Sequence, residues 1–178
     1  MRSGCAAIGV DLVVPKASPH PLVRFVQGDA EALPLEDASI DGALCECALC
    51  TFPNKEQAAR ELARVLRPGT RLALSDVTAE PERLPAELAT VEAWVACVAD
   101  ARPLEEIAAL LEQAGLTVEQ SESHDRELAS LLERVEARLR AVRVLAAFDV
   151  ERALELCAAA RNAVLDGILG YSVVIARR

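Results

Sequence analysis

Short apolar runs alternate with amphipathic segments along most of this chain, and glycine, proline or aspartate residues separate them. Runs of strand length occur at 5–10, 22–27, 40–45, 71–77, 116–121 and 171–176. Apolar residues recur at helical spacing over 54–66, 85–100 and 104–114, where Asn54 and Pro103 are typical start residues. Alternation of strands with helices predicts an α/β fold with a mostly parallel sheet.

A longer helical stretch interrupts this alternation before the last apolar run. Two helices are expected at about 126–147 and 150–166, and the first has a heptad pattern from Leu128 to Ala146. We therefore divide the chain into a core at 1–125, an inserted helical hairpin at 126–166 and a final core strand at 167–178. The role of the hairpin stays open between a packing element, a lid over a substrate pocket and a homodimer contact.

Length, composition and charge narrow the classes of function. The chain has 178 residues, of which 52% are hydrophobic and 26% are charged, as expected of one globular domain. Its 28 acidic residues outnumber 19 basic ones, so the net charge of -9 argues against nucleic-acid or anionic-membrane partners. No apolar run is long enough for a transmembrane helix or a signal peptide. We therefore expect a cytoplasmic protein with free thiols.

Three sequence fragments stand together in a fixed order. They are Ile8-Gly-Val-Asp-Leu12, Val26-Gln-Gly-Asp-Ala-Glu-Ala-Leu-Pro34, and Ala63-Arg-Val-Leu-Arg-Pro-Gly69 leading into Leu72-Ala-Leu-Ser-Asp76. Together they resemble class I S-adenosylmethionine-dependent methyltransferases, the broad group that includes ubiquinone-biosynthesis and arsenite methyltransferases. The resemblance covers about 3–121 and the last strand. It implies a Rossmann-like sheet and methyl transfer from S-adenosylmethionine to a small-molecule acceptor, mainly by positioning the two reactants.

The resemblance also assigns roles to residues that follow the strands. Asp11, with Leu12 beside it, matches the position that holds the ribose hydroxyls, and Asp29 with Ala30 matches the adenine contact. Cys45 and Glu46 fall where the methionine part of the cofactor lies. Aspartate also caps turns, and Glu46 could equally be an exposed loop acid, so the role of Glu46 is left open.

The glycine-rich first motif of that family, a strand followed by G-x-G-x-G and a helix, does not occur in the sequence. We expect an N-terminally truncated sheet that begins just before the family's second strand. The missing central strand leaves three alternatives: an upstream segment exists, the sheet has re-paired, or another chain fills the space. It also leaves a second hypothesis for function, a non-catalytic methyltransferase-like module that acts in protein interaction or dimerisation.

The cysteine cluster is the last candidate for chemistry. Cys45, Cys47 and Cys50 could bind a soft metal or metalloid, since thiolates are suitable ligands. The spacing is not that of a zinc site, and neither histidine is nearby in the sequence, so we favour free thiols and expect no metal site. No acid–base constellation stands out, and the catalytic residues stay unknown.

Overall fold

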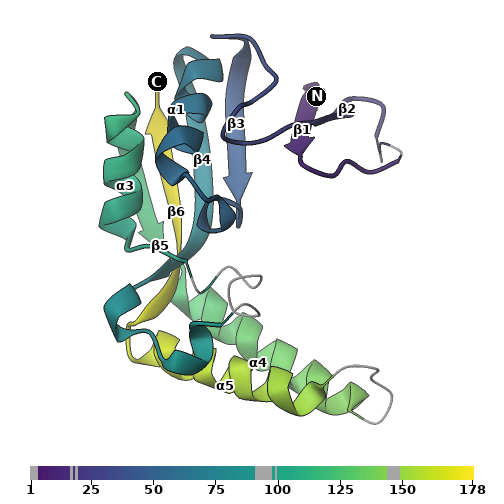
Figure 1. The fold of residues 1–178 in the computed structure, drawn as a ribbon, viewed down its shortest axis with the longest axis vertical. Helices are drawn as coiled ribbons and strands as arrows, with labels where there is room; N and C mark the ends of the chain where they lie inside the picture. The colour runs from purple at the N-terminus through teal and green to yellow at the C-terminus, as the bar shows by residue number, and fades with distance from the viewer. Residues whose placement is uncertain (1–3, 17, 19, 91–97, 99, 144–148) are drawn as a thin grey trace.

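The computed structural model describes residues 4–16, 18, 20–90, 98, 100–143 and 149–178. The expected strands and helices occur in the expected order (Figure 1), apart from the helix expected at 85–100. The strands are β1 (Ala7–Asp11), β2 (Val23–Gln27), β3 (Ile40–Glu46), β4 (Leu66–Ala79), β5 (Thr117–Ser123) and β6 (Leu169–Arg177). The α-helices are α1 (Lys55–Val65), α3 (Leu104–Gln113), α4 (Asp125–Val142) and α5 (Val150–Leu165). Short 3-10 helices are η1 (Leu49–Thr51), η2 (Pro81–Arg83) and η3 (Ala86–Leu88).

The main sheet has four strands in the order β3-β4-β6-β5. Strand β4 is parallel to β3 and antiparallel to β6, and β6 is antiparallel to β5. Three of these four strands, β3, β4 and β5, therefore run in one direction. This arrangement confirms the prediction of an α/β, Rossmann-like fold with a mostly parallel sheet.

The other two strands form a separate parallel pair, β1-β2. Figure 1 shows β1 between β2 and β3, with β1 and β3 running in the same direction. Neither strand of the pair is hydrogen-bonded to the four-stranded sheet. The missing central strand left three alternatives. Among the described residues the strands have not re-paired around the gap, so that alternative is wrong. An upstream segment and a second chain remain as alternatives.

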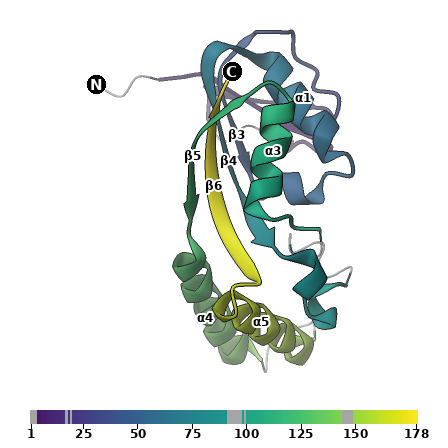
Figure 2. The ribbon, with the colours of Figure 1, turned by 90° about the vertical axis from the view of Figure 1, so that its left-hand side faces the viewer.

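One face of the four-stranded sheet carries the main hydrophobic core. Helices α1 and α3 both lie on this face, as Figure 2 shows with the sheet seen from its edge. Paired residues occupy matching rows, so Cys45, Leu74 and Val174 lie side by side on this face and all three are buried. Other buried members of this core are Leu72 and Ala176 on the same face of the sheet, Leu111 on α3, and Leu116 just before β5.

Local sequence signals explain where the two covering helices begin and end. The Asn54 side chain accepts a hydrogen bond from the Gln57 N–H at 3.0 Å, as the capping pattern predicted. Helix α3 follows Pro103 and ends before Gly115, whose φ of +89° lies in the left-handed region that glycine adopts without strain.

Strand β4 begins earlier than expected. We predicted a helix over 54–66 and a strand from 71, but β4 already pairs with β3 at Leu66, just before the Arg67-Pro68-Gly69 turn. The turn instead forms an irregularity inside β4, between the pairs Ile40–Leu66 and Gly42–Arg71. Gly69 has a φ of +83°, and its N–H donates to the Arg178 carbonyl at 2.7 Å.

Helices α4 and α5 follow β5 and precede β6 in the sequence. The two helices pack side by side (Figure 1). Apolar residues of both helices pack in a second cluster with the C-terminal part of β4 and the start of β6, including Val77, Ala163, Val164 and Leu169. We expected a helix at 85–100. The described part of this segment begins with the short 3-10 helix η3, and most of the other residues of the segment lie outside the described part of the chain. The described helices are too short or too polar to cross a lipid bilayer.

Candidate functional site

The residues matched to cofactor binding lie at the C-terminal ends of three strands. Asp11 is the last residue of β1, Asp29 follows β2 by two positions, and Glu46 is the last residue of β3. Strands β1 and β2 pair in parallel with Asp11 opposite Gln27, so Asp11 and Asp29 lie at the same edge of that pair. This edge is where ligands bind in open α/β sheets.

Asp11 combines a turn-forming role with an accessible carboxylate. Its Oδ1 accepts the N–H of Val13 at 3.1 Å, which bends the chain directly after β1. The residue is nevertheless exposed, and Leu12 beside it is 64% exposed. The Gln27 side chain donates to the Leu12 carbonyl at 3.0 Å, which fixes the start of this loop against the end of β2.

Asp29 is held in a similar turn. Its Oδ1 accepts the Glu31 N–H at 2.9 Å, and its main-chain carbonyl accepts the Ala32 N–H at 3.1 Å. Ala30 is half-buried between them, whereas Asp29 is exposed. The structure therefore presents two exposed carboxylates from adjacent strand ends, each with its carboxylate oriented by a main-chain N–H.

The loop that carries Asp29 is anchored to α1. The Glu31 carboxylate accepts the N–H of Asn54 at 2.7 Å, and the Glu61 carboxylate accepts the N–H of Leu33 at 2.7 Å. Arg64 donates to the carbonyls of Leu33 and Leu35 and forms an ion pair with Glu61 at 2.7 Å. This ion pair and the Leu33 hydrogen bond lower the pKa of the Glu61 carboxyl.

The structure separates the two residues matched to the methionine end. Glu46 is exposed at the end of β3, but the Cys45 side chain points into the core between the sheet and its helices. Burial first, and the Asp76 charge second, raise the pKa of the Cys45 thiol to about 12. Cys45 can therefore contribute to a cofactor site only through its main chain.

The three cysteines that are close in sequence have different surroundings in the structure. Cys47 is exposed in a left-handed conformation with φ of +46°, its sulfur 3.6 Å from the Tyr171 hydroxyl, whereas Cys45 and Cys50 are buried. Within the described ranges, no three histidine, cysteine or acidic side chains are grouped as metal ligands would be.

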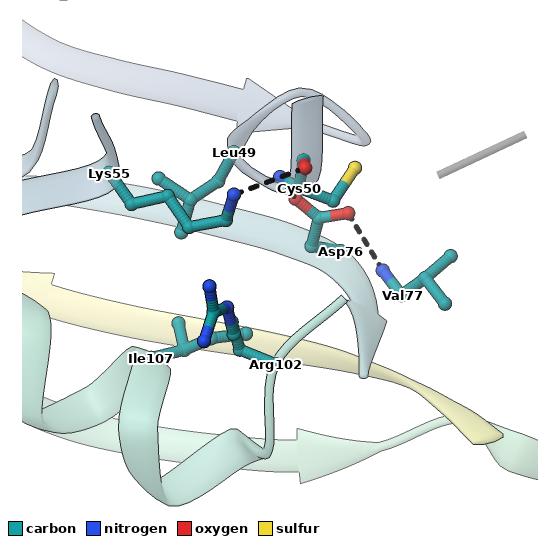
Figure 3. Close-up of a pocket in the computed structure, with 7 residues that line it drawn as sticks. All are labelled: Leu49, Cys50, Lys55, Asp76, Val77, Arg102 and Ile107. Atoms are coloured by element: carbon teal, nitrogen blue, oxygen red, sulfur yellow. Dashed lines mark hydrogen bonds between the residues drawn. The ribbon is translucent and has the colours of Figure 1, made fainter. Parts of the chain in front are cut away.

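A polar cluster that the sequence interpretation missed lies beneath this loop (Figure 3). Asp76, only 1% exposed, accepts the N–H groups of Cys50 at 2.9 Å and Val77 at 2.8 Å. The buried Lys55 amino group donates to the Cys50 carbonyl and also pairs with Asp100. Burial raises the pKa of Asp76 despite these hydrogen bonds.

This cluster is structural. Its seven lining residues leave no space for a water molecule between them, and the hydrogen bond of the Cys50 N–H to Asp76 holds η1 against β4. The signal for it was present in the sequence, because Asp76 continues the alternation of Leu72 and Leu74 toward the core face. A larger open groove of about 530 Å³ lies between η3 and α5, lined by residues such as Pro85 and Asn162.

Comparisons with known proteins show what the sequence and the fold of this chain are similar to. Residues 3–74 match the methyltransferase domain family. Methyltransferase GfsG of Streptomyces halstedii is 37% identical over 131 residues, which cover 72% of this chain and 44% of that protein. Among solved structures, a protein described as a sarcosine dimethylglycine methyltransferase from Galdieria sulphuraria superposes with a TM-score of 0.76. It is 20% identical, over 87% of this chain and 59% of that one.

A second solved structure covers almost the whole chain. Geranyl diphosphate methyltransferase in complex with S-adenosylmethionine superposes with a TM-score of 0.77 and 16% identity, over 99% of this chain and 70% of that one. The chain spans roughly half the length of the first curated relatives or less. By sequence, residues 3–74 are therefore similar to the methyltransferase domain family and to relatives named as arsenite and ubiquinone-biosynthesis methyltransferases, and by fold the chain is similar to solved methyltransferases, although its sequence contains no G-x-G-x-G turn.

Proposed function

We propose that this chain provides the ribose-, adenine- and part of the methionine-binding residues of a methyltransferase that acts on a small molecule. The observation that carries the proposal is the placement of Asp11 and Asp29, two exposed carboxylates at adjacent ends of the parallel strands β1 and β2. The relatives are named as methyltransferases, which favours this function over a non-catalytic interaction module.

The residues at this edge fit the cofactor's groups. The Asp11 carboxylate would accept hydrogen bonds from both ribose hydroxyls, and Leu12, largely exposed beside it, would pack against the nucleoside. Asp29 and the Ala30 main chain would bind the adenine amino group. Glu46 and the Cys45 main chain would lie near the methionine part, which carries positive charge that the Glu46 carboxylate would attract.

The bound cofactor would supply an activated methyl group, and the protein's contribution would be to hold the acceptor in line with it. Such a reaction needs few acid–base side chains, in keeping with the absence of an acid–base constellation in the sequence. The acceptor would lie near the ends of β3 and β4. There the Tyr171 hydroxyl lies next to Cys47, and burial raises the pKa of this hydroxyl so that it stays protonated.

Calorimetric titration with S-adenosylhomocysteine tests the proposal. We expect saturable binding by the unmodified chain and at least about tenfold weaker binding by Asp11→Asn and by Asp29→Asn, since each loses a hydrogen bond to a charged acceptor. Glu112→Gln, at an exposed position on α3, is the matched control and should bind as the unmodified chain does. Absence of saturable binding, or equal affinity in all four proteins, would refute the assignment.

We also propose that the protein acts in the cytoplasm and forms a homodimer through α4 and α5. Support for the dimer comes from exposed apolar side chains on this hairpin, Leu131, Val142 and Leu165. Light scattering during gel filtration should give twice the mass of 19.0 kDa. Leu131→Glu should shift the protein toward the monomer, and a monomeric mass for the unmodified chain would exclude this dimer.

A further inference from the structure

Tyr171 brings a hydroxyl group from the last strand to the end of β3. It is the third residue of β6 and is paired with Val77 in β4, which lies between β3 and β6 in the sheet (Figure 1). Its hydroxyl reaches across β4 to Cys47, which directly follows β3, and the contact with the Cys47 sulfur lies at the protein surface. The hydroxyl is therefore placed at the edge where open α/β sheets bind their ligands.

The neighbours of this hydroxyl leave its proton available to a ligand. A tyrosine oxygen can accept two hydrogen bonds and donate one. The Cys47 thiol donates to it, and the side chain of Ser75 in β4 also forms a hydrogen bond with it. In the part of the chain that the structure describes, no carbonyl or carboxylate oxygen accepts the Tyr171 proton. Burial raises the pKa of this hydroxyl, so at neutral pH it is a hydrogen-bond donor and not a base.

The start of the helical hairpin fixes the position of Tyr171. The Asp125 carboxylate accepts the Tyr171 N–H at 3.1 Å, and the Tyr171 carbonyl accepts the His124 N–H at 2.7 Å. The ring is half-buried against the second hydrophobic cluster, as is Leu128 of α4. Gly170 permits this close approach, because a Cβ atom there would lie 2.5 Å from the Asp125 carboxylate. The hairpin therefore holds both the main chain and the ring of Tyr171.

We propose that Tyr171 is a specificity-determining residue, whose hydroxyl donates a hydrogen bond to a carbonyl or hydroxyl oxygen of the methyl acceptor, and that Asp125 is its positioning residue. This inference rests on the proposed methyltransferase function, which places the acceptor near the ends of β3 and β4. A fixed donor favours molecules with an oxygen at the matching position, because the donor stays unpaired against molecules that lack one. An ammonium group can only donate, and Ser75 and Cys47 already bond to the Tyr171 oxygen.

The hydroxyl can be observed by itself, because the chain contains a single tyrosine. The protein is labelled with a carbon isotope at the tyrosine Cζ atom, and the Cζ chemical shift is followed by nuclear magnetic resonance. Cyclohexanone and cyclohexylamine are the probes, because they share a ring but carry a carbonyl oxygen and an ammonium group at neutral pH. We expect cyclohexanone to shift the Cζ signal in a saturable way, with an affinity at least about tenfold higher than that of cyclohexylamine.

Substitutions test the hydroxyl and its support separately. Tyr171→Phe keeps the ring, and saturation-transfer measurements should show cyclohexanone binding at least about tenfold more weakly, whereas the affinity for S-adenosylhomocysteine should be unchanged. Asp125→Ala should weaken cyclohexanone binding and move the Cζ signal of the ligand-free protein. Asp125→Asn should restore both, because its side-chain oxygen still accepts the Tyr171 N–H. Glu133→Gln, at an exposed position on α4, is the matched control and should behave as the unmodified chain does.

Three results would overturn the proposal. They are a Cζ signal that does not respond to cyclohexanone, an equal response to the two probes, and equal affinity of the unmodified chain and Tyr171→Phe for cyclohexanone. The Cζ measurement uses the unmodified chain, so it decides even if a variant fails to fold. It also needs no cofactor. Failure of S-adenosylhomocysteine to bind would therefore refute the cofactor assignment, whereas a silent Cζ signal in a chain that binds this cofactor would refute the role of Tyr171 alone.

Discussion

Two leucines on opposite faces of the main sheet should respond very differently to truncation. Leu74 is 1% exposed and lies in the core between the sheet, α1 and α3. Leu44 belongs to the adjoining strand but is 86% exposed on the opposite face. We compare Leu74→Ala with Leu44→Ala, which remove the same atoms, so that any difference in stability reflects the surroundings of each side chain.

The expected magnitudes follow from burial. Leu74→Ala loses the transfer free energy of a buried leucine and leaves a cavity in a packed core, which together cost about 3 kcal/mol of unfolding free energy. For a domain of this size, that corresponds to a fall of roughly 6–12 °C in melting temperature. Leu44→Ala loses contact with few atoms, so the expected cost is at most ~0.5 kcal/mol.

Urea unfolding followed by circular dichroism measures both changes, and the slope of free energy against urea shows whether the denatured state is altered. Equal destabilisation by the two variants would refute the reasoning, because it would mean that the face around Leu44 is covered in solution. A cost below ~1 kcal/mol for Leu74→Ala would contradict the packing of the core itself.

Three further predictions concern charge and thiols. Iodoacetamide at pH 8 should modify the exposed Cys47 at least about tenfold faster than Cys45, because burial and a pKa of about 12 keep the Cys45 thiol protonated. Mass spectrometry measures both rates, and equal rates would contradict this prediction. Glu61→Gln should lose about 1–3 kcal/mol at pH 7. Because folding lowers the pKa of Glu61, its contribution is complete above the ordinary value of 4.5 and disappears as pH falls through the lowered pKa. Urea midpoints of the two proteins should therefore converge in acid, and a constant difference would refute this role. Asp76→Ala should cost roughly 2–4 kcal/mol by leaving buried N–H groups such as that of Cys50 without an acceptor, and a melt within 2 °C of the unmodified chain would exclude it.

The elements that depend on local sequence were predictable. Apolar runs bounded by turn residues gave the strands to within a few residues, and Asn54 caps α1 as its spacing with Gln57 indicates. The start of β4 was not predictable in the same way. Leu66 enters the sheet because it pairs with Ile40, which lies 26 positions earlier, and no local signal distinguishes a helix end from the first residue of a strand there.

The sequence indicated candidate residues for the site, but it did not indicate the residues that hold the loop after β2 in place. The family resemblance assigned roles to Asp11 and Asp29, and the structure places Asp11 at the end of β1 and Asp29 two positions after β2. The anchors of the loop after Asp29 could not be recognised, since Glu61 and Arg64 look like ordinary surface residues of an amphipathic helix and meet Leu33 across about 30 positions. Cys45 shows why neighbours in the sequence can have different surroundings. Successive side chains of a strand point to opposite faces of the sheet, so the Cys45 thiol enters the core although Glu46 is the next residue.

The support of the candidate cofactor site lies largely outside its strands. In a continuous sheet, hydrogen bonds between neighbouring strands would fix Asp11 and Asp29 relative to Glu46. Here β1-β2 has no such bonds to β3, and the contacts of the loop after β2 with α1, through Glu31, Glu61 and Arg64, do this instead.

A loop anchor of a few hydrogen bonds restricts motion less than a paired strand does, so we expect β1-β2 to adopt other arrangements relative to β3 besides the binding geometry. The apparent affinity for a cofactor is reduced by the fraction of molecules outside that geometry. A strand between β1 and β3 would raise affinity even without touching the cofactor, because it would remove the other arrangements. For the cofactor site proposed above, we therefore expect cofactor binding and the ordering of β1-β2 against β3 to be thermodynamically coupled, so that each strengthens the other by the same factor.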